Sequence, residues 1–228
     1  MKPSRLLYSV YMLSFFVLLS FSHTRIEADQ GEERNVCFNW AFGALVGGEA
    51  DRSPVSVERD TVLKAGDRLK MLVELKKKCF IYLIYHSCQN DVYMLFPSDL
   101  EQFDTDYQIK RKYYIPNNDR WFVLDENTGR ETYYLLASSQ RLFELERLLT
   151  KYQSPQTSNK SELVKQILTE IRKVKKRNRK LTTTAERPIQ IGGNMRNGKK
   201  AKSPDIDNIA LMISAAKFYS RTFTIDHQ

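Results

Sequence analysis

The sequence predicts a mainly β fold, an antiparallel β-sandwich with two helices inserted before the last strand. Three observations support this prediction. Short stretches with alternating apolar residues recur through the first two thirds of the chain, turn-forming residues separate them, and the apolar spacing becomes helical only after Ser139. Many short strands with one helical segment are typical of two sheets that bury one face each against the other.

The N-terminus has the layout of a secretory signal peptide. Lys2 and Arg5 precede an uncharged apolar run, and Ser20 and Ser22 supply small residues in front of a cleavage site. The run is 16 residues long, whereas a membrane-spanning helix needs about 20. We therefore expect a signal peptide over residues 1–22 and export to the periplasm or the extracellular space. The alternative is an uncleaved segment that anchors the protein in the membrane.

The rest of the chain predicts one domain over residues 36–228, preceded by a polar lead-in at 23–35. Within this domain we expect a helical insertion at 139–181 and a mobile basic loop at 182–205. The net charge of +9 belongs to one segment, because residues 160–202 hold 14 Lys or Arg and 3 Asp or Glu. The basic character is therefore a property of this segment and not of the whole fold.

The strands of the first half follow from periodicity and turns. Apolar residues alternate over Leu69–Leu75, which predicts a strand with one buried face. The stretch Cys79–His86 is apolar on both faces and favours a central strand. Turn residues at Gln89–Asp91 join it to a partner strand, Val92–Phe96, and Pro97 ends the pairing because it has no N–H to donate.

The following segment gives weaker patterns. We expect a loop over Ser98–Asp106 and a strand over Tyr107–Ile115. Two further stretches, Trp121–Leu124 and Glu131–Ala137, predict a pair of strands joined by a turn at Asn127–Gly129.

The helical insertion and the last strand have the clearest spacing. Leucines at helical intervals predict a helix over Gln140–Tyr152. A second helix begins after Asn159, which can cap it together with Glu162, and its apolar stripe runs to Val174. Apolar and polar residues alternate again over Arg221–Ile225, which predicts the closing strand.

Several short motifs along the chain resemble those of a known bacterial family. They are AGDRL (Ala65–Leu69), FIYLIY (Phe80–Tyr85), YMLFP (Tyr93–Pro97), YYIP (Tyr113–Pro116), TGRETYYLLAS (Thr128–Ser138) and, more weakly, SRTFTIDH (Ser220–His227). Through residues 65–142 the chain resembles DUF4384, a family of domains of unknown function. The resemblance implies no assigned active site. It implies an accessory domain of kinase-like or protease-like proteins, or an exported protein that stands alone.

Signatures of catalysis and of metal binding are scarce. The chain has no GxSxG, HExxH, CxxC, P-loop or GxGxxG motif, so we expect no enzyme activity, no cofactor and no metal. His86 lies near two cysteines, but the strand places it and Cys79 on opposite faces. Glu131 stands at a strand entrance, where a carboxylate either caps turn amides or lines a binding cleft.

The three cysteines allow two interpretations. Either two of them form one disulfide, as is common in exported proteins, or all three are thiols that pack like small apolar residues. The sequence does not decide which two would pair among Cys37, Cys79 and Cys88.

These observations favour a non-catalytic module of the cell envelope that binds a protein partner or a cell-wall polymer. Its basic segment can also bind an anionic lipid surface, whereas predicted export disfavours nucleic acid. Two alternatives stay open: a hydrolase that uses carboxylates, and a nucleic-acid-binding protein that uses the basic helix. The candidate binding residues are aromatic side chains of the central hairpin and its surroundings and basic side chains of the second helix: Tyr82, Tyr85, Tyr93, Trp121, Lys173, Lys175, Lys176, Arg177, Arg179 and Lys180.

Overall fold

The computed structural model describes residues 35–47, 54–179, 185–188 and 205–228. The predicted signal peptide and nearly all of the polar lead-in lie outside these residues. Most of the predicted basic loop also lies outside them, although four of its residues form a strand, β10 (Ala185–Pro188).

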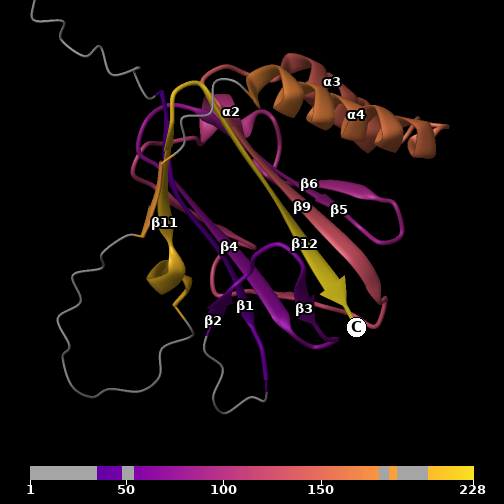
Figure 1. Cartoon of the computed structure of the whole chain (residues 1–228). Coiled ribbons are helices and arrows are strands. Elements are labelled where there is room, and N and C mark those ends of the chain that lie inside the picture. The colour runs from indigo at the N-terminus through magenta and orange to yellow at the C-terminus, as the bar shows by residue number, and fades with distance from the viewer. Residues whose placement is uncertain (1–34, 48–53, 180–184, 189–204) are drawn as a thin grey trace, which may run out of the picture. The chain divides into compact units, whose positions relative to one another are not determined.

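Two sheets build the fold, which confirms the predicted class (Figure 1). Sheet A holds β1 (Val36–Leu45), β2 (Pro54–Ser56), β4 (Arg68–Leu75), β7 (Lys112–Ile115), β8 (Phe122–Val123), β10 and β11 (Leu211–Ala215). Its main path is β10-β11-β1-β4-β7, while β2 pairs with β1 and β8 pairs with β4. All of these pairs are antiparallel.

Sheet B has five strands and joins distant parts of the chain. They are β3 (Thr61–Leu63), β5 (Phe80–His86), β6 (Val92–Phe96), β9 (Gly129–Ser138) and β12 (Phe218–His227), in the order β3-β12-β9-β5-β6. The β3–β12 pair is parallel and the other pairs are antiparallel. The C-terminal strand therefore lies inside the sheet, next to β9 (Figure 1).

The main core lies between the two sheets. Every second residue of β1 and β4 enters it, with Trp40 and Met71 as examples, and sheet B contributes Leu83, Leu135 and Phe223. This is the alternation that the sequence predicts for half-buried strands.

Helices cover the other face of sheet B. They are α3 (Phe143–Gln153) and α4 (Lys160–Asn178), which lie side by side over β5 and β9 (Figure 1). Their apolar residues, such as Leu145 and Ile167, pack with Ile84 and Leu136 in a second core. The side chain of Asn159 accepts a hydrogen bond from the amide of Glu162, so the predicted helix start is confirmed. No described helix has both the length and the apolar character that crossing a membrane requires.

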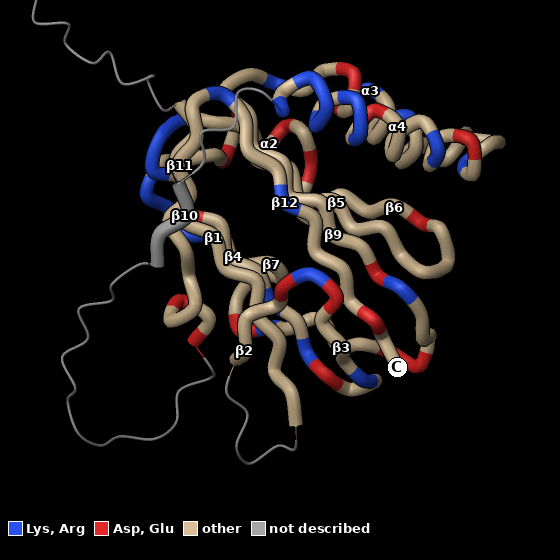
Figure 2. The backbone as a smooth tube through the Cα atoms, in the orientation of Figure 1, with Lys and Arg blue, Asp and Glu red and all other residues tan. Residues whose placement is uncertain are grey.

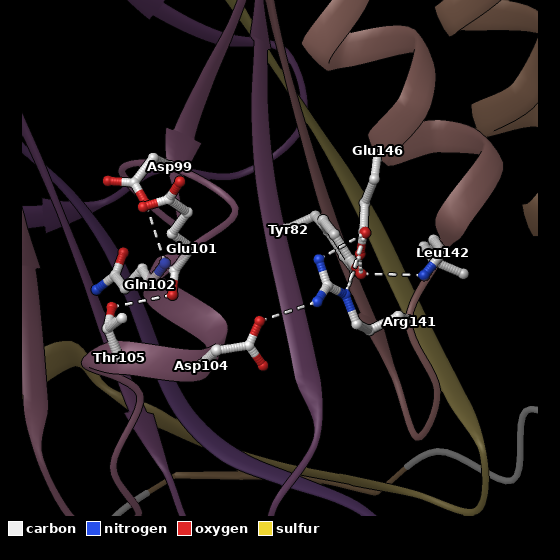
Figure 3. Close-up of polar contacts among 9 residues, drawn as sticks. All are labelled: Tyr82, Asp99, Glu101, Gln102, Asp104, Thr105, Arg141, Leu142 and Glu146. Carbon is white, nitrogen blue, oxygen red and sulfur yellow. Dashed lines mark hydrogen bonds and ion pairs between the residues drawn. The ribbon is translucent and has the colours of Figure 1, made fainter.

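A buried polar network attaches α3 to sheet B (Figure 3). The hydroxyl of Tyr82 donates to Glu146 Oε1 at 2.5 Å and accepts from the amide of Leu142 at 3.0 Å. Arg141 donates from Nη2 to Glu146 Oε2 at 2.8 Å and also reaches Asp104. The Tyr82 side chain is fully buried, and burial raises its pKa.

Three local predictions were wrong. The expected loop at 98–106 contains a short helix, α2 (Gln102–Thr105), and the strand expected from Tyr107 begins only at Lys112. Residues 121–124 and 131–137 do not pair, because β8 joins β4 in sheet A while β9 lies in sheet B. The turn between them passes from one sheet to the other, which local sequence patterns do not reveal.

Candidate functional site

A groove of about 1010 Å³ opens along the edge of β7. All four residues of this strand line it, from Lys112 to Ile115. Among the described strands β7 is the last in its sheet, since it pairs with β4 alone. Its outer side therefore presents backbone N–H and C=O groups that no described strand uses.

The walls of the groove come from parts of the chain that are distant in sequence. On the side of sheet B they are the end of β6 and α2, where the amide of Gln102 donates to Asp99 at 2.9 Å and the hydroxyl of Thr105 donates to the Glu101 carbonyl (Figure 3). On the side of sheet A they are the loop 116–120 and the start of a 3-10 helix, η2 (Ile206–Ile209).

Lys70 is a charged residue of the groove that is almost completely buried. It lies on β4, on the outer face of sheet A, and only 6% of its surface is exposed. Its ammonium donates to the carbonyl of Asn118 at 2.5 Å and lies 5.4 Å from the ring centres of both Tyr114 and Trp121. Burial lowers the pKa of Lys70, while the nearby charge of Asp119 acts in the opposite direction. The carbonyl and the two aromatic faces stabilise the ammonium group at this position.

Two other basic residues of the groove already have acidic partners. Lys112 forms an ion pair with Asp207, which also accepts a hydrogen bond from the Tyr114 hydroxyl at 3.1 Å. Arg111 forms an ion pair with Asp106. These contacts hold η2 against β7 and fix the shape of the opening.

The predicted aromatic residues do not form one surface. Tyr82 is fully buried beneath the helices, so its prediction as a surface residue was wrong. Tyr85 is half-buried and stacks between Tyr133 and Tyr93, and only Tyr93 of these is largely exposed, at 51%. Trp121 is the one predicted aromatic residue beside the groove, where its ring contacts Lys70.

The predicted basic residues that the structure describes lie on the last turns of α4 and, in the case of Arg179, at its C-cap (Figure 2). Lys176, Arg177 and Arg179 are exposed, as is Lys173, which pairs with Glu170 at 3.2 Å. Lys175 instead points to sheet B, where it donates to Thr222 at 2.7 Å, and burial lowers its pKa. Lys180 lies outside the described residues.

Glu131 is buried, with 4% of its surface exposed, and it does not line the groove. The Tyr85 hydroxyl and the Cys88 thiol both interact with its carboxylate, while Oε2 has no hydrogen-bond partner among the residues that the structure describes. His227, on the neighbouring strand, also has an unpartnered nitrogen. Among the described residues, no three His, Cys, Asp or Glu side chains are arranged to hold a metal ion.

The structure has all three cysteines as thiols. Cys79 and Cys88 precede and follow β5, so they lie at opposite ends of the same strand and cannot be joined. Cys79 is buried close to Cys37, and burial raises its pKa to about 12. Of the two interpretations that the sequence left open, the structure has the three thiols, of which Cys79 is buried and Cys88 is exposed.

Sequence reasoning missed Lys70 and the edge of β7. The pattern around Lys70 places it opposite an apolar face, which is typical of a solvent-exposed strand residue. The loop 116–120, which returns over the outer face of sheet A, covers its side chain together with Tyr114 and Trp121. The signal available in the sequence was that two charged residues, Lys70 and Glu74, stand on the outer face of a strand that is otherwise mostly apolar.

Fold and groove together define a two-sheet β protein with a helical layer on one sheet and a polar groove at the edge of the other. Residues 62–141 match the family model described as "Domain of unknown function (DUF4384)". The match confirms the resemblance and covers a little over a third of the chain, from β3 to the end of β9. It includes Lys70 and β7 but not α3 or α4. No curated protein and no solved structure matches the chain.

Proposed function

We propose that this protein is an exported, non-catalytic module of the cell envelope that binds a protein partner in the groove at β7. One observation carries the proposal: an edge of β7 with which no described strand pairs lies in a groove large enough for a polypeptide segment. Proteins often bind extended segments by adding them as a further strand to such an edge. The rims of α2, η2 and the loop 116–120 protect this edge from unspecific pairing, which an open edge would invite.

Photo-crosslinking in the intact cell tests this proposal. A photoreactive amino acid replaces Asn117 or Thr105, which are exposed residues lining the groove. The control position is Gln156, which is exposed in the turn between α3 and α4. We expect both groove positions, and not the control, to form an adduct with the same protein.

The purified partner then serves for a second measurement. Hydrogen exchange of the β7 amides, over Lys112–Ile115, should become slower when this partner is added. The proposal is rejected if the groove positions give no protein adduct, if Gln156 gives the same one, or if the exchange of β7 stays unchanged.

Export is part of the proposal and is supported by the predicted signal peptide. A fusion of residues 1–40 to a reporter that is active only outside the cytoplasm tests it. We expect activity from the fusion, and loss of activity when Leu6 and Leu7 are replaced by Arg. An inactive fusion that stays in the cytoplasm would favour the nucleic-acid-binding alternative.

The basic end of α4 favours a second candidate function, attachment to an anionic envelope surface. Three of its exposed residues, Lys176, Arg177 and Arg179, lie within one turn of helix. Each Lys or Arg near an anionic surface contributes about 1 kcal/mol. Replacing all three by Glu should therefore weaken sedimentation with phosphatidylglycerol vesicles by about 100-fold or more.

The matched control reverses three other exposed lysines of the helical layer, Lys151, Lys160 and Lys165. It changes the net charge equally but leaves the end of α4 intact. Equal weakening by both triple variants would show that only net charge matters and would reject this surface.

A further inference from the structure

We infer that Lys70 is the anchor of the groove and binds a carboxylate side chain of an extended polypeptide segment that pairs with β7. This inference rests on the proposed function and deepens it, because it names the chemistry of the partner segment.

The first argument concerns the charge of Lys70. A buried ammonium group is costly unless it is paired, and almost all buried lysines have an acidic partner. In the part of the chain that the structure describes, no carboxylate lies within ion-pair distance of Lys70. Its contacts are one carbonyl and two aromatic faces. An ammonium group has three N–H donors, so donors remain for a group that enters the groove.

The second argument compares Lys70 with the other cations of the groove. Lys112 and Arg111 each form an ion pair with an aspartate of this chain. Arg120 is exposed to water and donates to a backbone carbonyl at 3.5 Å. Among the described residues, Lys70 therefore differs from all three, because it is buried and the carboxylate of Asp119 acts on it only from beyond ion-pair distance. A carboxylate gains most at this position, since ion pairs strengthen where water is excluded.

The third argument is the place of Lys70 relative to β7. Met71 is opposite Ile115 in the β4–β7 pair, so Lys70 lies one residue beyond the end of this strand. Lys70 and Tyr114 belong to the same outer face of sheet A, as their contact shows. A segment added beside β7 would lie about 4.8 Å from it. Its side chains on this face would stand beside that of Tyr114, and Lys70 would lie one strand further, about 10 Å from the added backbone.

The acidic residues of the groove restrict the partner further. Asp99, Asp119 and Asp205 line the groove, and none of them forms an ion pair among the described residues. They repel a strongly acidic segment and attract basic residues. The preferred segment therefore has one carboxylate at the Lys70 position and neutral or basic residues next to it.

Two synthetic peptides test this inference directly. They are Lys-Thr-Val-Glu-Val-Thr-Lys, with blocked ends and a fluorescent label, and the same peptide with Gln in place of Glu. Fluorescence anisotropy with the full-length protein gives their affinities. We expect the wild-type protein to bind the Glu peptide at least 10-fold more tightly than the Gln peptide.

The protein variants assign this preference to one side chain. Lys70→Gln should bind both peptides with equal affinity, at the level of the Gln peptide. Arg120→Gln removes an exposed cation of the same groove and should keep the preference. Urea unfolding of each variant shows that the fold is retained. If Lys70→Gln does not fold, Lys70→Met, which keeps the apolar stem without the charge, should likewise bind both peptides with equal affinity.

Failure of this inference can be distinguished from failure of the proposed function. Equal binding of both peptides by the wild-type protein rejects the anchor, as does a preference that persists in Lys70→Gln. If neither peptide binds, the anchor is also rejected. In each case the crosslinks from Asn117 and Thr105 decide separately whether the groove binds a protein.

Discussion

Replacing Arg141 by Met should destabilise the attachment of the helical layer to sheet B while the apolar contacts of both cores stay in place. The guanidinium of Arg141 contacts both oxygens of the Glu146 carboxylate, which also accepts from the Tyr82 hydroxyl. Methionine keeps much of the apolar stem of arginine and removes the charge. In this variant the Glu146 carboxylate stays buried, and the Tyr82 hydroxyl is the one group of the network that still donates a hydrogen bond to it.

The structure sets the expected magnitude. Removing one partner of a buried ion pair costs about 3–5 kcal/mol, because the remaining charge is left uncompensated. The side chain of Glu146 is 6% exposed but that of Arg141 is 24% exposed, so water reaches one side of the pair. We therefore expect the lower end, a loss of about 3 kcal/mol. For a protein of this size that corresponds to a decrease in Tm of about 6–12 °C.

Urea unfolding followed by circular dichroism measures this loss. Arg147→Met is the matched control, because Arg147 pairs with Glu144 on the exposed side of the same helix. Exposed pairs of this kind contribute little to stability, because water and salt screen them. In the double variant Arg141→Met with Glu146→Leu the uncompensated charge is gone, so much of the lost stability should return.

The reasoning is refuted if Arg141→Met and Arg147→Met lose the same free energy of unfolding. It is also refuted if the double variant is less stable than Arg141→Met alone, because the loss would then come from packing and not from a buried charge.

Three further predictions concern single residues. In the native protein at pH 8, Cys88 should react with a thiol reagent while Cys79 should not, because Cys79 is buried and its pKa is raised to about 12; equal labelling by mass spectrometry would contradict this. Gly129→Ala places a Cβ 2.7 Å from that of Cys88 and should lower the free energy of unfolding by more than about 2 kcal/mol. Gly66→Ala is also at positive φ but has open space around it, so it should lower this free energy by about 1 kcal/mol. Similar losses for the two variants would exclude the clash with Cys88. Burial lowers the pKa of Lys70 in the folded protein, so between this lowered pKa and the ordinary value of 10.5 the unfolded chain binds more protons than the folded one. The free energy of unfolding of the wild type, relative to Lys70→Met, should therefore rise as the pH approaches 10.5. A fall of this free energy in urea titrations would show that the pKa of Lys70 is not lowered.

The positions of most elements could be predicted from local sequence patterns. Alternation over Leu69–Leu75 indicated β4, the apolar run after Cys79 indicated β5, and the capping residue Asn159 marked the start of α4. These features depend on neighbours within one turn or one strand. Periodicity and capping therefore suffice to predict them.

The candidate site could be predicted only in part. Trp121 was predicted as a binding residue and lies beside Lys70, whereas Tyr82 was predicted on the surface and is buried under α3 and α4. An aromatic residue in a strand gives the same pattern whether its face meets water or a helix. The covering element comes from a distant part of the chain, so the pattern does not identify it.

The sequence by itself determined which segments form strands, through alternating apolar residues, and which form the two amphipathic helices, through apolar residues at helical spacing. Only the tertiary structure decided that β8 joins sheet A, that β7 ends its sheet in a groove, and that a returning loop buries Lys70. The physical reason is that strand formation depends on nearby residues, whereas pairing, covering and burial depend on contacts between residues far apart in the chain.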